Sequence, residues 1–115
     1  MAARHHQQLR LPYPYPVVLD AFARVLPQIG FRVSTVDPAR GMVFAARPTS
    51  LWSWGENVTI QVGQVAPTEP SEARVDSALA FGLVDWGRNR RNVEKIVAEI
   101  DGFLAEHAAA ARLSE

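Results

Sequence analysis

The residues of this chain whose types and spacing could do chemistry lie mainly in two short stretches, 50–58 (SLWSWGENV) and 85–96 (DWGRNRRNVEKI). The second stretch gathers positive charge at the start of a predicted helix: Arg88, Arg90, Arg91 and Lys95. Cations in the first turn of a helix oppose its dipole, so an anion or an acidic side chain must offset them. The pattern therefore indicates either an anionic ligand at this helix start, where backbone amides also point outward, or internal ion pairs with nearby acids, Asp85, Glu56 and Glu94.

The first stretch carries two tryptophans beside a glycine. Trp52 and Trp54 share one face if the chain is extended there, and Gly55 allows a bend. Large aromatic side chains in such a place can line a ligand pocket or a partner surface. They can equally close the end of the core together with Trp86. Glu56 is the acid of this neighbourhood.

Together the two stretches give the predicted ligand-binding residues: Trp52, Trp54, Glu56, Asp85, Arg88 and Arg91. Within this set Glu56 is a candidate ion-pair partner of Arg88 or Arg91. Asn89 is different, because its helical phase places it in the middle of the apolar arc. An unsatisfied amide there would cost about 1–3 kcal/mol. We therefore expect Asn89 to tie the helix start to the backbone of the strand beneath it or to the preceding loop.

Several kinds of chemistry are absent from the sequence. There is no cysteine, which excludes disulfides, thiolate metal sites and cysteine nucleophiles. No metal-protease, phosphate-loop or nucleophile-elbow motif occurs, and His5 and His6 are adjacent, which makes them poor chelators. We expect no enzyme activity, no cofactor and no metal site.

Charge and hydropathy limit the partners. Twelve basic and twelve acidic residues give a formal net charge of zero, so we expect no nucleic-acid binding. No apolar run approaches the roughly 20 residues of a membrane span, and the first residues lack the apolar centre of a signal peptide. The sequence predicts a soluble cytoplasmic protein.

The strongest helical pattern covers residues 85–104. Its apolar side chains fall within one arc of about 120°: Trp86, Val93, Ile96, Val97, Ile100, Phe103 and Leu104. A second helix of roughly eleven residues is predicted to begin at Pro16, with Pro27 disturbing its last turn and Gly30 as a terminator. Strands are predicted at 9–13, 31–37, 42–47, 57–65 and 73–79, where apolar residues recur at a period of two.

The faces of these strands are also predicted. Val58, Ile60 and Val62 alternate inward. Phe31, Val33 and Thr35 are expected on one face of the first hairpin strand. Met42, Phe44 and Ala46 alternate in the same way along the second hairpin strand.

The element order β-α-β-β-β-β-α predicts an α+β fold. We expect an antiparallel sheet with both helices packed on one face and a long C-terminal helix. Residues 9–107 form a single domain in this prediction. Residues 1–8 are expected to be a flexible tail, and residues 108–115 a fraying one.

The motifs SxxSWGExV and DWGxNRRNVExI resemble those of a group of small bacterial domains of unknown function, over about residues 9–104. The element order is similar to the TATA-binding-protein-like and helix-grip folds, which include proteins that bind lipids and small ligands. That resemblance implies a fold and supplies no activity.

The sequence thus predicts a non-enzymatic binding domain for a small apolar or amphiphilic ligand in a cleft between helix and sheet, with an anionic ligand also considered. The alternative is a protein–protein interaction module, homodimeric in one form, that uses the sheet face or a sheet edge.

Overall fold

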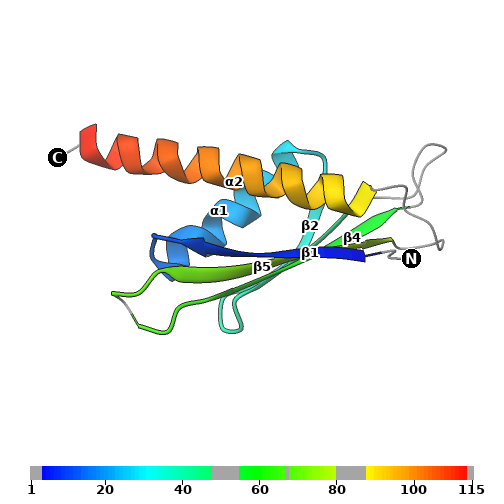
Figure 1. Ribbon diagram of the computed structural model, residues 1–115, viewed down its shortest axis with the longest axis horizontal. Helices are drawn as coiled ribbons and strands as arrows, with labels where there is room; N and C mark the ends of the chain where they lie inside the picture. Colours follow the sequence, from blue (N-terminus) through cyan, green and yellow to red (C-terminus); the bar gives the residue numbers. More distant parts are fainter. Residues whose placement is uncertain (1–3, 48–54, 67, 80–87, 114–115) are drawn as a thin grey trace.

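Seven elements follow the predicted order along the chain. The computed structural model describes residues 4–47, 55–66, 68–79 and 88–113. Its elements are β1 (Arg4–Leu11), α1 (Tyr15–Gln28), β2 (Arg32–Asp37), β3 (Met42–Arg47), β4 (Glu56–Gly63), β5 (Ser71–Leu79) and α2 (Arg88–Leu113). The strands form one antiparallel sheet in the order β1-β5-β4-β3-β2, and both helices lie on one face of it (Figure 1). The predicted fold class is confirmed.

Helix α1 covers one half of the sheet. Proline stands within its first turn, where a missing N–H costs no helical hydrogen bond. Val18, Phe22 and Val25 are fully buried against β2, β3 and β4. The helix is 14 residues long and includes Pro27, so this proline does not end it. The backbone N–H of Phe31 closes the end of the helix by donating to the carbonyl of Leu26 (3.0 Å).

Helix α2 covers the other half of the sheet, over β1 and β5 (Figure 1). Its apolar arc is buried as predicted at Val93, Ile96, Ile100 and Leu104, each at most 1% exposed. The facing strand positions are equally closed: Val58, Ile60, Val62, Ala73 and Val75. These side chains belong to one apolar cluster. Among the residues that the structure describes, the space between helix and sheet is therefore occupied by side chains.

The N-terminal end of the ordered chain reaches further than predicted. Residues 4–8 belong to β1, which pairs with β5 from Arg4↔Ala78 to Leu11↔Ser71, whereas we expected a flexible tail up to residue 8. The pairing supplies backbone partners that this polar segment cannot find locally. At the other end, helix α2 continues to Leu113 through the alanine-rich segment that we expected to extend the helix and fray.

The β2–β3 hairpin differs from the prediction in its faces. Val43 and Ala45 point inward and are 0% and 5% exposed, while Phe44 points outward and is 39% exposed. In β2 a bulge between Val33 and Thr35 interrupts the alternation. The predicted common face of Phe31, Val33 and Thr35 is therefore wrong, because Val33 pairs with the inward Ala45 and Thr35 with the outward Phe44. Met42, Phe44 and Ala46 do alternate as predicted, on the outer face of a strand that is apolar on both faces.

Candidate functional site

The inner face of the sheet becomes polar at one end, under the first turns of α2. Five residues meet there, and we call them the polar cluster: Arg47, Glu56, Ser77, Asn89 and Asn92. They come from three adjacent strands and from α2. Four of the five are at most 7% exposed. The rest of the buried core near them is apolar, so this end of the helix–sheet interface is chemically distinct.

Strand pairing brings the two charges of the cluster together. Arg47 is the last residue of β3 and Glu56 the first of β4, and the two are direct partners across the ladder. Gly55, with a φ of +83°, immediately precedes Glu56 in a left-handed conformation that favours glycine. The distance from Arg47 Nη1 to Glu56 Oε1 is 3.6 Å. Glu56 is fully buried, whereas the side chain of Arg47 remains 32% exposed.

The guanidinium of Arg47 makes several contacts at once. Its Nη1 donates to Asn92 Oδ1 and its Nη2 to the carbonyl of Ile29, both at 3.4 Å. Its Cζ lies 4.4 Å from the centroid of the Phe31 ring, within the range of a cation–π contact. These contacts hold the guanidinium between α1, the sheet and α2. Because part of it stays exposed, it can also receive a hydrogen-bond acceptor from solvent.

The neutral half of the cluster ties α2 to β5. Ser77 Oγ donates to Asn89 Oδ1 at 2.7 Å, and Asn92 Nδ2 donates to Ser77 Oγ at 3.4 Å. Asn89 and Asn92 are three residues apart and so lie on the same side of the helix. Asn89 therefore ties the helix start to the strand beneath it, as expected, but this contact is to a side chain of that strand and not to its backbone, where we expected it.

Replacing Asn89 by leucine is expected to lower the free energy of unfolding by about 1–3 kcal/mol, because it leaves the Ser77 hydroxyl buried without this acceptor. Asn57→Leu is the matched control, since Asn57 is exposed on the opposite face of the sheet. Thermal melting should separate the two variants by several degrees, as about 1 kcal/mol shifts the midpoint by roughly 4 °C in a domain of this size. Equal melting temperatures for both variants would contradict the role of Asn89.

The predicted site residues are only partly brought together. Glu56 is in the polar cluster, where Arg47 is an ion-pair partner that the sequence analysis did not consider. The predicted pairing of Glu56 with Arg88 or Arg91 stays a prediction. Arg91 is exposed in the first turns of α2, and Arg88 is the first residue of that helix. Trp52, Trp54 and Asp85 lie outside the described residues.

An ion pair of the kind predicted lies at the basic start of α2. Arg90 Nε lies 2.9 Å from Glu94 Oε1, one helical turn further along, and both side chains are more than half exposed. Such a pair adds only a few tenths of a kcal/mol.

The sequence analysis missed Arg47, Ser77 and Asn92 as site residues. The available signal was Ser77, a serine at a strand position that alternates with the inward Ala73 and Val75. Strand β3 is apolar on both faces, so its pattern gave no such signal for Arg47.

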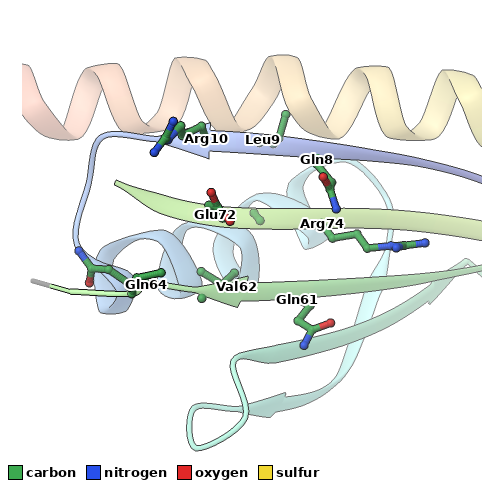
Figure 2. Close-up of a pocket in the computed structure, with 11 residues that line it drawn as sticks. Gln8, Leu9, Arg10, Gln61, Val62, Gln64, Glu72 and Arg74 are labelled. Carbon is green, nitrogen blue, oxygen red and sulfur yellow. The ribbon is translucent and has the colours of Figure 1, made fainter. Parts of the chain in front are cut away.

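The described surface has hollows away from the polar cluster. One of about 630 Å³ lies at the β4–β5 end of the sheet, where Figure 2 shows Gln8, Gln61 and Arg74 on neighbouring strands. A smaller groove of about 420 Å³ runs between the helices and is lined by residues such as Val17, Phe103 and His107. Neither hollow is lined by a residue of the polar cluster.

The described residues show neither a metal site nor a membrane-spanning helix. No three His, Cys, Asp or Glu side chains gather there as a metal site would require. Neither described helix combines the length and the apolar composition needed to cross a bilayer.

Comparisons with known proteins identify the fold of this chain. No protein-family model matches the sequence, and no curated protein matches it. Among solved structures, the chain is similar to the crystal structure of Ara h 8.0201, with a TM-score of 0.57 and 8% sequence identity over 90% of this chain and 97% of that one. At this identity the likeness shows the fold alone, an α+β helix-grip arrangement in which a sheet curves around a long C-terminal helix. The resemblance of the two sequence motifs to bacterial domains of unknown function stays a prediction.

Proposed function

We propose that this protein is a non-catalytic binding domain for a small amphiphilic molecule with an anionic head group. The head group binds at Arg47 of the polar cluster, and the apolar part lies along the same end of the helix–sheet interface. The observation that carries this proposal is the polar cluster itself, a buried set of charged and amide side chains in an otherwise apolar core.

The free energy of burial supports a functional reason for these residues. Buried charges lose their hydration, and a buried ion pair is often no more stabilising than apolar side chains of similar volume. Apolar residues at positions 47 and 56 would therefore close this end of the core at least as well. A contact with a ligand would explain why the polar cluster stands at this end of the core.

The geometry of Arg47 fits an anionic acceptor. Glu56 is fully buried with its Oε1 3.6 Å from Nη1 of Arg47, while 32% of the Arg47 side chain stays exposed. An arginine offers five N–H donors in a planar fork that matches a carboxylate or a phosphate. Glu56 and Asn92 hold that fork in place.

The packing of the interface limits where the apolar part can lie. Ile96 and Ile100 of α2 are fully buried against the sheet, so this part of the interface is filled. The ligand therefore lies toward the polar end. The three tryptophans of the chain, Trp52, Trp54 and Trp86, are close in sequence to Glu56 and Asn89. Their fluorescence is a natural reporter of binding at this end.

Titration with decanoate tests the proposal, with decanol as the uncharged counterpart. Decanoate is expected to shift the tryptophan emission saturably and to bind more tightly than decanol. Arg47→Met should weaken decanoate binding about 10- to 100-fold, because a hydrogen bond to a charged group contributes about 1.5–3 kcal/mol. The matched control is Arg32→Met, at an exposed arginine of β2. Absence of any saturable response to either compound, together with ligand-free protein in native mass spectrometry after purification, would overturn the proposal.

A further inference from the structure

The sheet has two edges in the described part of the chain, β1 and β2, on opposite sides (Figure 1). An edge strand presents backbone N–H and C=O groups that can pair with another strand. We propose that β2 is the docking surface for a second copy of this chain, which pairs with it antiparallel about a twofold axis between Ser34 and Thr35. Two five-stranded sheets then join into one. This inference is independent of the proposed ligand.

The sequence of β2, RVSTVD, is complementary to itself when it is reversed. With the twofold axis at its centre, Arg32 faces Asp37 of the second copy and Val33 faces Val36 of the second copy. Ser34 then faces Thr35. Each of these contacts occurs twice by symmetry. Opposite charges, β-branched apolar residues and hydroxyl pairs are the cross-strand combinations that stabilise antiparallel sheets.

The bulge in β2 makes this pairing consistent with the faces of the sheet. Val33 pairs with Ala45 and Val36 with Val43, and both of these β3 residues point inward. Val33 and Val36 are three residues apart, so a regular strand would place them on opposite faces. The extra residue, Ser34, restores them to one face, and its Oγ donates to the carbonyl of Phe44 (3.2 Å). Arg32 and Asp37 share the other face.

The side chains involved are available for a partner. Val36 is 42% exposed, one of few large apolar side chains so exposed in the described residues. Arg32 is exposed and makes no ion pair within the part of the chain that the structure describes. Asp37 Oδ2 lies 3.9 Å from Arg40 Nε, a long ion-pair contact to a side chain that is 82% exposed, and Asp37 Oδ1 accepts from the backbone N–H of the same residue. A second copy supplies an arginine to Asp37 and an aspartate to Arg32.

The charges of the two edge strands favour β2 over β1 as the strand that pairs with a second copy. Strand β1, RHHQQLRL, contains two arginines and two histidines and no acid. Antiparallel pairing of two β1 strands would bring basic residues opposite or diagonal to one another, which destabilises a sheet. An edge of six residues buries little surface compared with a standard interface, so we expect a weak dimer.

Charge reversal tests both the edge and the register. Sedimentation equilibrium of the wild-type chain over increasing concentrations, up to the highest that stays in solution, should show a monomer–dimer equilibrium that salt weakens. Arg32→Asp and Asp37→Arg should each be monomeric, because each opposes like charges. An equimolar mixture of the two variants should form a heterodimer, since each reversed charge then meets its opposite. Arg10→Asp, the same change on β1, is the control and should dimerise like the wild type.

Two results would overturn the proposal: a wild-type chain that stays monomeric at the highest concentration, or variants whose mixture does not associate although both are folded by circular dichroism. Asp37 Oδ1 also accepts from the backbone N–H of Arg40 in the hairpin turn, so Asp37→Arg could lose its fold. Val36→Glu then replaces it, as it places a carboxylate opposite Val33 of the second copy. A dimer that survives Val36→Glu would exclude this register.

Discussion

Replacing Gly41 by alanine is expected to lower the free energy of unfolding by about 3 kcal/mol or more. Gly41 has a φ of +69°, a left-handed conformation that costs other residues about 1–2 kcal/mol. A Cβ at this position would lie 2.1 Å from the carbonyl oxygen of Val62 and 3.2 Å from Cε1 of Tyr15. The strand carrying Val62 must therefore move, which strains the hydrogen bond from the Val62 N–H to the Gly41 carbonyl (2.8 Å).

The Gly41 contact matters because it joins three parts of the fold. The β2–β3 turn lies against β4 through Gly41, and the Tyr15 hydroxyl at the start of α1 donates to the carbonyl of Pro38 in the same turn. A displaced turn would therefore disturb both the sheet and the α1 contact. The same substitution at Gly102 is the control, because this glycine is in α2 with no atom within 4 Å of an added Cβ.

Urea denaturation measures both glycine variants. Gly102→Ala should raise stability by up to about 1 kcal/mol, the difference between glycine and alanine in an exposed helix. Gly41→Ala should unfold at a clearly lower urea concentration with a similar slope. A Gly41→Ala variant as stable as the wild type would show that the turn can relax away from β4.

The order of elements could be predicted because apolar periodicity is strong in most of them. In β4, Val58, Ile60 and Val62 alternate with polar residues, and only one face can be buried. Strand β1 could not be predicted in full. Its first residues are polar, and their strand conformation depends on pairing with β5, about 70 residues further along the chain.

The candidate site could likewise be predicted where it follows from local sequence, and not where it depends on contacts between distant residues. The role of Asn89 follows from its helical phase, because an amide in an apolar arc must find a partner. Arg47 reaches Asn92 across 45 residues of sequence, and nothing in either local pattern indicates that contact. The pairing of Arg47 with Glu56 depends on the β3–β4 register, which the two strands set together.

Replacing Arg47 by methionine is expected to lower the free energy of unfolding by about 3 kcal/mol. Removal of one partner of a buried ion pair costs about 3–5 kcal/mol, and the partial exposure of Arg47 places it at the lower end. Glu56 would stay fully buried without its guanidinium neighbour. Arg24→Met is the control: Arg24 Nε lies only 2.7 Å from Asp20 Oδ2, but both side chains are more than half exposed, so the change should stay within about 0.5 kcal/mol. An equal effect in both variants would mean that burial of Glu56 is not decisive.

The double variant Arg47→Met/Glu56→Leu separates stability from function. It removes both charges from the core, so it should recover most of the stability that Arg47→Met loses. Decanoate binding should not recover, since the guanidinium is still absent. Denaturation and fluorescence titration of the same samples would give both results. Recovered stability with lost binding would mean that the cluster is kept for the ligand, whereas recovered binding would exclude Arg47 as its contact.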